Sequence, residues 1–381
     1  EINKYIINTD EITYDKDKDI IYTEKNSRAQ SINNSIIIKA RDFIYKIKLN
    51  ELYAKRDVTI ENKSQNYKIF SNHIEYFKND EKFFSKGKTQ ANINSKYNFN
   101  SKNVTFLKNS MELFSYNDTK IIDNNSNLYN LSKFHYSIDN EILKGENIII
   151  NSNYNLPNNE KFYFSSAIID LNNQNFTAKD PEIRIQKSIF DNLDNDPRIK
   201  GISSSKNKAV TVINKGVFTS CKERKDGKCP PWSVKAKKIK HDSNKKQLIY
   251  DHAFLNIYDL PVFYFPKFFH PDPTVERQSG FLKPRFNNSN ILGSSFTIPY
   301  FNIISDNQDY TLTPTWFDNE IFMAHNEYRR VNENSKIIAD VGFASGYKSE
   351  TLNKKKNLNH LFAKFSQDLK LKNYNVSNLS L

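Results

Sequence analysis

Apolar and polar residues alternate in short runs along the first half of the chain. Residues 67–96 align without gaps to residues 97–126, and Tyr67 matches Tyr97. Within each copy apolar residues recur at every second position, which is the period of a β-strand. A phase change at Ser71–Asn72 predicts a bend, and the Lys-Asn-Asp and Lys-Asn-Ser segments are typical of hairpin turns. The pattern predicts stacked β-units that bury their apolar faces against their neighbours.

The apolar positions of these repeats leave two interpretations open. A closed β-sandwich core is the ordinary interpretation of such a pattern. However, the apolar residues are sparse for a thick two-sheet core at native packing density. Looser copies of the repeat at Tyr129–Ser152 and Phe162–Ile185 carry the same pattern toward the middle of the chain. The first half is therefore predicted to be all-β, with an interior that is either closed or incompletely filled.

The C-terminal part of the chain predicts longer strands. Apolar residues alternate with Asp and Gly over 337–343, as in membrane β-strands, which face lipid at every second residue. Prolines interrupt three strands, and each removes a hydrogen bond from the sheet. They are Pro284, Pro299 and Pro314, for which edge placement or a bulge is the ordinary explanation. The expected strands are Arg277–Phe286, Ser295–Ile304, a hairpin from Tyr310 that turns at Asp318–Asn319, Ile337–Tyr347 and Leu361–Leu371.

Composition narrows the class of protein. The 381 residues are enough for about two domains, and 38% of them are hydrophobic. No apolar run reaches the 18–20 or so residues of a transmembrane helix, which argues against a helical membrane protein but not against a β-barrel. The net charge of +13 comes from scattered lysines without a nucleic-acid motif, so we expect a phosphate-bearing partner and no nucleic acid. Because the chain begins at Glu1 and stops within a strand pattern, we expect a processed N-terminus and a missing C-terminal portion.

Two cysteines, Cys221 and Cys229, flank a turn-forming segment. A disulfide that closes this hairpin in an oxidising compartment is one interpretation, and two free thiols are the other. No metal site is predicted, because this stretch offers too few ligands for zinc.

No catalytic site is predicted. The seven histidines are dispersed without metal-ligand spacing, and no nucleophile or phosphate-binding motif is present. His270 is expected in a solvated turn, and Asp272 with Glu276 is expected to be surface charge. The protein is therefore predicted not to be an enzyme and to need no cofactor.

The segment Cys229–Phe286 differs abruptly from the rest of the chain, with one of the two Trp and seven of the twelve Pro. Three blocks follow one another around it: PPWSVKAKKIKHD, PVFYFPKFFHPDPTVERQSGFLKP and IPYFNIISDNQDYTLTPTW. Together they resemble the junction of the LPS-assembly outer-membrane protein family (LptD, or organic-solvent-tolerance proteins). The resemblance is strong over roughly residues 200–330 and upstream holds only as a style of repeat.

The resemblance implies a fold and its division. It implies an all-β chain with an open, V-shaped N-terminal jellyroll of OstA-like repeats over 1–260, whose inner side chains face lipid. A Pro- and aromatic-rich junction would follow at 261–275, lying in the membrane interface or as a plug beneath the barrel. Residues 276–381 would form the first strands of a truncated antiparallel transmembrane β-barrel. The expected lipid-binding trough comprises Ile69, Ile74, Phe84, Phe99, Val104, Phe114, Phe134 and Phe164.

The resemblance also implies a function. The protein would sit in the outer membrane with its jellyroll in the periplasm, and would move lipopolysaccharide (LPS) into the outer leaflet. An LptA-like bridge protein would deliver LPS by edge-to-edge pairing with Ile6–Ile44, and an LptE-like lipoprotein would plug the barrel. Pro284 and Pro299 would weaken the seam through which lipid leaves, a lateral gate. The alternative is a soluble β-repeat scaffold or adhesin without lipid cargo.

Overall fold

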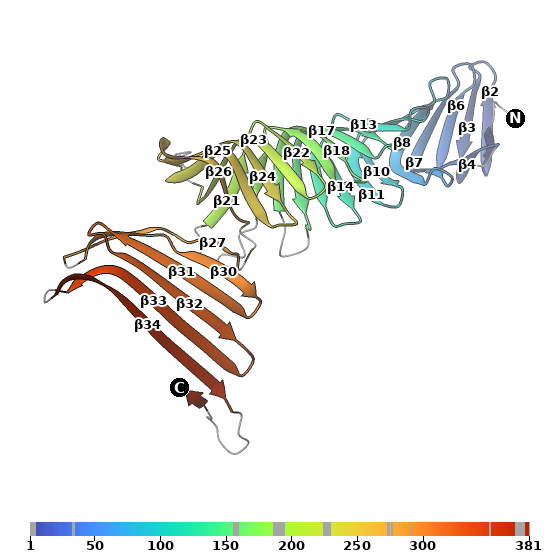
Figure 1. The fold of residues 1–381 in the computed structure, drawn as a ribbon. Helices are drawn as coiled ribbons and strands as arrows, with labels where there is room; N and C mark the ends of the chain where they lie inside the picture. Colours follow the sequence, from blue (N-terminus) through green and yellow to red (C-terminus); the bar gives the residue numbers. More distant parts are fainter. Residues whose placement is uncertain are drawn as a thin grey trace. The chain divides into compact units, whose positions relative to one another are not determined.

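The computed structural model describes residues 5–32, 35–154, 160–185, 195–223, 230–272, 275, 277–290, 292–349, 352–369 and 378–380. Every regular element in these residues is a β-strand, as the sequence predicts, and all strand pairs are antiparallel (Figure 1). The chain divides into two compact units, Glu1–Thr274 and Val275–Leu381. The structure is thus consistent with a jellyroll followed by part of a barrel.

Among the described residues, no helix is both long and apolar enough to cross a membrane.

The first unit is one continuous sheet whose strands succeed one another along its length (Figure 1). Its strands are β1 (Tyr5–Asn8), β2 (Glu11–Asp15), β3 (Ile20–Glu24), β4 (Ser27–Ser31), β5 (Ile36–Ala40), β6 (Asp42–Lys46), β7 (Glu51–Asn62), β8 (Tyr67–Phe77), β9 (Lys82–Ser85), β10 (Lys88–Ile93), β11 (Tyr97–Lys102), β12 (Thr105–Leu107), β13 (Glu112–Ser115), β14 (Thr119–Asp123), β15 (Leu128–Leu131), β16 (Lys133–Ser137), β17 (Ile142–Ser152), β18 (Glu160–Asp170), β19 (Asn175–Lys179), β20 (Glu182–Arg184), β21 (Asn195–Lys200), β22 (Ser203–Asn207), β23 (Val210–Cys221), β24 (Trp232–Asp242), β25 (Gln247–Ile257) and β26 (Leu260–Pro271).

Long strands fold this sheet into two facing walls. In β7, residues 51–55 pair with β6 and residues 59–62 pair with β5, with a register shift between Lys55 and Val58. Arg56 and Asp57 in that shift have positive φ angles of 62° and 52°, a backbone kink of the kind that bulges produce. β8, β17, β18 and β23 likewise pair with different strands at their two halves. One wall contains β1, β4, β5, β10, β11, β14, β15, β20 and β21, and the other contains β2, β3, β6, β9, β12, β13, β16, β19 and β22.

The repeat seen in the sequence is a structural repeat. The chain follows the same course in β8 to β10 and in β11 to β14. It runs along one wall, bends into the other wall, reverses there in a hairpin and returns to the first wall. The two hairpins end in Glu81 and Met111, which occupy equivalent repeat positions and have φ angles of 47° and 50°. Each loop has four residues, 78–81 and 108–111, and loops of this length are most often built around a type I turn. The local turn chemistry and the stacked architecture therefore agree.

The interior lies between the two walls. Phe99 of one wall packs against Phe134 and Tyr136 of the other, with ring centroids 5.4 and 5.0 Å apart. These strands are not hydrogen-bonded neighbours, so their contacts span the space between the walls. A second apolar cluster from Ile183 to Ala253 continues the interior, and Phe162 packs against both clusters. Most of the interior is therefore occupied by side chains.

The second unit is a single antiparallel sheet. Its strands are β27 (Gly280–Phe281), β28 (Arg285–Ser289), β29 (Gly293–Thr297), β30 (Tyr300–Ser305), β31 (Gln308–Phe317), β32 (Phe322–Val331), β33 (Ser335–Ser349), β34 (Leu352–Asp368) and β35 (Asn378–Ser380).

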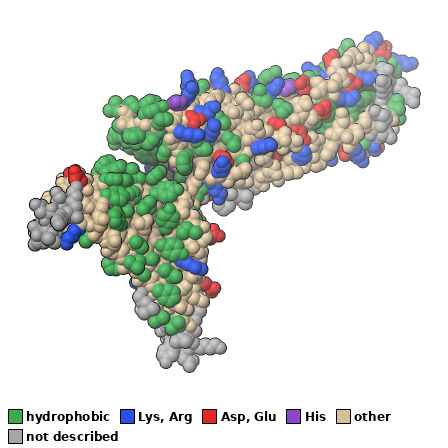
Figure 2. All heavy atoms as spheres, in the orientation of Figure 1, with side chains coloured by type: hydrophobic (Ala, Val, Ile, Leu, Met, Phe, Trp, Pro, Cys, Tyr) green, Lys and Arg blue, Asp and Glu red, His purple; other side chains and the backbone are tan. Residues whose placement is uncertain are grey.

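The two faces of this sheet differ in polarity. Because the pairing is in register, one face carries Leu312, Trp316, Val341, Phe343 and Leu361. Val341, Phe343 and Leu361 on that face are 47%, 41% and 69% exposed. The opposite face carries Asp309, His325, Glu327, Arg329 and Asp340. Figure 2 shows hydrophobic side chains spread over the visible side of this unit. This two-residue polarity period is the pattern of a sheet that meets lipid on one side.

The aromatic and proline-rich segment ends the first unit's sheet. As its prolines require, it is not a central strand: β26 pairs with β25 alone among the described strands. Val262, Phe263 and Phe269 are more than half exposed, and Figure 2 shows hydrophobic side chains gathered where Figure 1 labels β25 and β26. The division between units falls after Thr274, so β26 extends the first sheet. The membrane-interface and plug roles stay predictions.

The register predicts unequal costs for two adjacent phenylalanines. Phe83 is 2% exposed and opposes the inward Tyr76, whereas Phe84 opposes Glu75 on the outer side. Phe83→Ala should lower the free energy of unfolding by about 3–5 kcal/mol, and Phe84→Ala by clearly less. Urea unfolding of both variants measures the difference. Equal costs would contradict the assigned register.

Candidate functional site

An apolar cavity lies at the N-terminal end of the interior. It has a volume of about 430 Å³ and is lined by Ile7, Ile21, Ile38, Leu52 and Tyr76, with Asn50 and Lys78 also in its lining. β1, β3, β5, β7 and β8 supply these side chains, so both walls contribute. A mostly apolar space of this size with a few polar groups is typical of a small-molecule or lipid site.

The end of the sheet at this cavity presents two unpaired edges. Among the described strands β1 pairs only with β4, and β2 pairs only with β3. Ile6, Ile12 and Tyr14 on these edge strands are exposed. An edge with free backbone groups and apolar side chains is a template for strand addition by another chain.

Six of the eight residues predicted to line the trough face the interior. Their side chains are 5% exposed or less, and they are Ile69, Ile74, Phe99, Val104, Phe134 and Phe164. Phe84 and Phe114 instead point to the outer side, half-buried. The inward positions beside them belong to Phe83 and Leu113, which oppose the inward Tyr76 and Phe106. Cross-strand pairing, not sequence alternation alone, decides the phase after the hairpin.

Glu141 bridges the two walls on the side where their hairpin turns lie. Its carboxylate accepts hydrogen bonds from Lys96 Nζ at 2.9 Å and Tyr97 Oη at 3.0 Å. Burial alone would raise the pKa of Glu141, but these bonds hold it below its usual value. Lys96 and Tyr97 belong to the wall of β10 and β11, whereas Glu141 precedes β17 at the turn from β16. This polar bridge marks the rim of the apolar interior.

A second polar cluster lies near the C-terminal end of the first unit. His241 of β24 is hydrogen-bonded to Asp272, and both side chains are largely buried. Burial lowers the pKa of His241, but the bond to Asp272 and the charges of Asp272 and Glu160 outweigh burial and raise it. Burial also raises the pKa of Glu160. The expectation that Asp272 is surface charge is therefore wrong, and Glu276 lies outside the described residues.

His270 is not in a solvated turn, as the sequence suggested, but within β26. Its ring bonds Tyr250 Oη at 2.7 Å and packs against Phe218 at 5.1 Å. Burial lowers the pKa of this imidazole. The prediction of a solvated turn is wrong. It relied on the prolines of the HPDP segment, whereas the strand runs to Pro271.

Pro284 and Pro299, the two prolines expected to form a gate, lie where the first two strands of the second unit are interrupted. Pro284 separates β27 from β28, and Pro299 separates β29 from β30. Around them Leu282 N donates to Pro299 O at 2.8 Å and Ile298 N donates to Pro314 O at 3.3 Å. Pro314 itself lies inside β31, opposite Ala324. Among the described strands, β27 and β28 form an edge of the sheet, and the first strand is thus both broken and on that edge.

Cys221 ends β23, is half-buried and forms no disulfide with any of the described residues. Cys229 lies outside the described residues, so the proposed disulfide stays a prediction.

Fold and site define a class of protein: a repeat-built, double-walled β-sheet with an apolar interior, followed by a sheet with one exposed apolar face. No family model matches the chain. The LPS-assembly protein LptD of Idiomarina loihiensis is 28% identical over 160 residues, which is 42% of this chain and 20% of that protein. That of Pasteurella multocida is 26% identical over 163 residues, 43% of this chain and 19% of that protein. That of Shewanella oneidensis is 34% identical over 105 residues, 26% of this chain and 14% of that protein.

These matches confirm the resemblance to the LPS-assembly family that the junction motifs indicate. The matched region spans only about a fifth or less of the length of these relatives.

The His241–Asp272 pair predicts a pH dependence of stability. Because the folded-state pKa of His241 is raised, its contribution is complete below the unfolded value of 6.5 and is lost as pH rises through the folded value. The free energy of unfolding should therefore fall as the pH rises above the unfolded-state pKa of about 6.5. His241→Asn should flatten this fall and lower stability by about 3 kcal/mol at the acidic end, because Asp272 is left buried without its charge partner.

Trp232 fluorescence in a Trp316→Phe background reports unfolding of the first unit in that test. Trp232 packs against Phe218 near the cluster, whereas Trp316 belongs to the second unit. An unchanged pH profile in His241→Asn would contradict the assignment.

Proposed function

We propose that this chain takes part in transporting LPS and inserting it into the outer leaflet of the outer membrane. The main support is the sheet of the second unit, which has one polar face and one exposed apolar face. The apolar face suits contact with membrane lipid. The similarity to LPS-assembly proteins also supports this proposed role. The proposed role is transport, not catalysis, so the protein acts as a conduit and not as an enzyme.

In this proposal the first unit lies in the periplasm and receives LPS. The cavity beside Ile7, Ile21 and Leu52 would take acyl chains first, since it offers apolar space between the walls. Acyl chains would then move along the interior past Phe99 and Phe134, displacing the contacts that these rings make with each other. Burying acyl chains there is favourable by roughly 0.8 kcal/mol for each CH₂ group removed from water.

The donor of LPS would be a periplasmic bridge protein of like jellyroll fold, similar to LptA. Its terminal strand would pair with β1 or β2, whose outer edges have no partner among the described strands. The exposed Ile6 and Ile12 lie on these strands, next to the cavity that both help to line. Docking at this edge would therefore join the two apolar interiors.

The phosphate-bearing head of LPS would remain at the surface. The chain has a net charge of +13, and an outer groove of about 560 Å³ holds Lys133, Lys144 and Lys179 beside Phe114. Cationic side chains next to an apolar strip suit the border between sugar phosphate and lipid.

The second unit would supply the first strands of an outer-membrane barrel, which an LptE-like lipoprotein would plug. LPS would leave through the edge formed by β27 and β28, where Pro284 and Pro299 interrupt the pairing. A strand edge with fewer ladder hydrogen bonds opens at lower cost than a continuous one.

The alternative is a β-repeat scaffold or adhesin without lipid cargo. The dense packing of the interior around Phe99, Tyr136 and Leu143 favours it, because these side chains already fill the space between the walls.

Photo-crosslinking in living cells distinguishes the two functions. A crosslinking amino acid at Ile21, in the cavity, or at Phe99, in the interior, should form adducts with LPS. The same residue at Asn98, which neighbours Phe99 but is exposed, is the matched control and should form few adducts. Absence of adducts at both interior positions would favour the scaffold.

Replacing the gate prolines tests the seam. Pro284→Val with Pro299→Val should slow LPS export, because both positions could then join the sheet hydrogen bonding. Pro314→Val is the control, since that residue already lies within β31. Export is measured as the rate at which newly made LPS reaches the cell surface. Unchanged export in the double variant would remove the gating role.

A further inference from the structure

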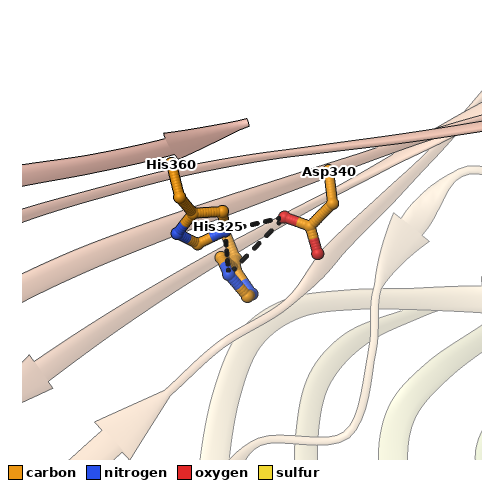
Figure 3. A group of neighbouring side chains, drawn as sticks. All are labelled: His325, Asp340 and His360. Carbon is orange, nitrogen blue, oxygen red and sulfur yellow. Dashed lines mark hydrogen bonds and ion pairs between the residues drawn. The ribbon is translucent and has the colours of Figure 1, made fainter. Parts of the chain in front are cut away.

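Three side chains converge on the polar face of the second unit. His325 lies on β32, Asp340 on β33 and His360 on β34, which are three adjacent strands. Figure 3 shows the two imidazole rings and the carboxylate directed toward one another. No sequence motif predicts this group, because its members are far apart along the chain.

Strand register brings them together. His325 pairs with Gly342 on the middle strand, and Gly342 pairs with His360 on the far side. Asp340 lies two residues before Gly342, so its side chain emerges on the same face. Gly342 has no side chain, and a Cβ there would overlap the ring of His360. The glycine therefore leaves the space in which the two rings meet above the middle strand.

The separations of the three ligand atoms match one face of a tetrahedron. His325 Nε2 lies 3.1 Å from His360 Nε2, and Asp340 Oδ1 lies 3.5 Å from His325 Nε2 and 3.3 Å from His360 Nε2. An ion bound at about 2.0–2.1 Å by tetrahedrally arranged ligands has ligand–ligand distances of about 3.3–3.4 Å. Small movements of the exposed side chains would complete that geometry.

We propose that His325, Asp340 and His360 form a binding site for a zinc-class divalent metal ion. Two imidazoles and one carboxylate suit zinc, nickel or copper, whereas magnesium and calcium prefer oxygen ligands alone. The three groups leave a fourth position for water or for an anionic oxygen. A bound ion would tie β32, β33 and β34 together.

The surroundings suit such a site. All three side chains are partly exposed, so an ion can reach them from solvent. Phe362 packs beside His360, with ring centroids 5.1 Å apart, which restricts the orientation of that imidazole. Glu327 pairs with Asp340 in register and adds negative charge beside the site. Arg329 partly offsets that charge, because its Nε lies 3.5 Å from Glu327 Oε1.

Metal titration of the purified full chain tests the site. The background is Cys221→Ser with Cys229→Ser, which removes thiol ligands. Zn²⁺ should bind at one equivalent in competition with a chromophoric chelator, and Co²⁺ should give visible d–d absorption. Loss of an outer-shell partner weakens metal binding by about 10–100-fold. Loss of a ligand should cost at least as much, so His325→Asn, Asp340→Asn and His360→Asn should each weaken Zn²⁺ binding by that factor or more. His135→Asn, on the first unit, is the matched histidine control and should bind as the parent does.

Gly342→Ala provides a second test that keeps all three ligands. The added methyl group should displace the His360 ring and weaken Zn²⁺ binding, and the rise in unfolding temperature that Zn²⁺ gives the parent should shrink in this variant. Failure of Zn²⁺ to bind, or equal affinity in the parent and the ligand variants, would overturn the proposal and leave a metal-free hydrogen-bonded group. None of these readouts depends on LPS transport.

Discussion

Cross-strand register is the constraint on which the rest of the structure depends. A strand exposes alternate residues to its two sides, so the pairing of a long strand such as β7 or β8 fixes which residues face the interior. The same long strands bend and pass from one wall to the other, which makes a single sheet enclose an apolar space. A slip of one residue would turn Phe83 outward and Phe84 inward, and would bring the outward side chains of the whole strand into the interior.

Local features of the fold were predictable from the sequence, and features that depend on pairing were not. The repeat, the bend near Ser71 and the turns that end at Glu81 and Met111 are encoded within short segments, and the structure shows all of them. Phe84 and Phe114 were expected in the trough, but the phase after each hairpin is set by the partner strand, which turns both side chains outward. Arg277–Phe286 and Ser295–Ile304 were each predicted as one strand, whereas the structure divides both segments at Pro284 and Pro299.

The candidate sites show the same division. His241 and Asp272 meet only because β24 and the end of β26 lie near each other, and neither has a local motif. His325 and His360 were interpreted as dispersed, because no sequence spacing connects them. They meet because both pair with Gly342 on the strand between them. A strand-pairing map drawn from the meander would have placed His325, Gly342 and His360 in one row. The apolar cavity also arises from several strands and has no signature in any one of them.

The two units put the same alternation to different uses. In the first unit the apolar side chains face one another across the walls, and the interior can admit a lipid chain only by parting them. In the second unit the apolar side remains exposed, and the polar side gathers Asp309, Arg277 and Arg329 into ion pairs. An apolar interior in one unit and an exposed apolar face in the other are the two kinds of surface that the proposed transport of an amphiphile needs.

Filling the cavity tests the central claim, that the interior of the first unit binds acyl chains, most directly. The measurement is the affinity of the purified chain for LPS, by fluorescence titration, with Ile7→Trp in the cavity and Tyr154→Trp on the exposed surface as the matched control. The account predicts that Ile7→Trp weakens LPS binding by about tenfold or more, a change of about 1.4 kcal/mol, while Tyr154→Trp binds as the parent does. Equal binding by the parent and both variants would contradict it.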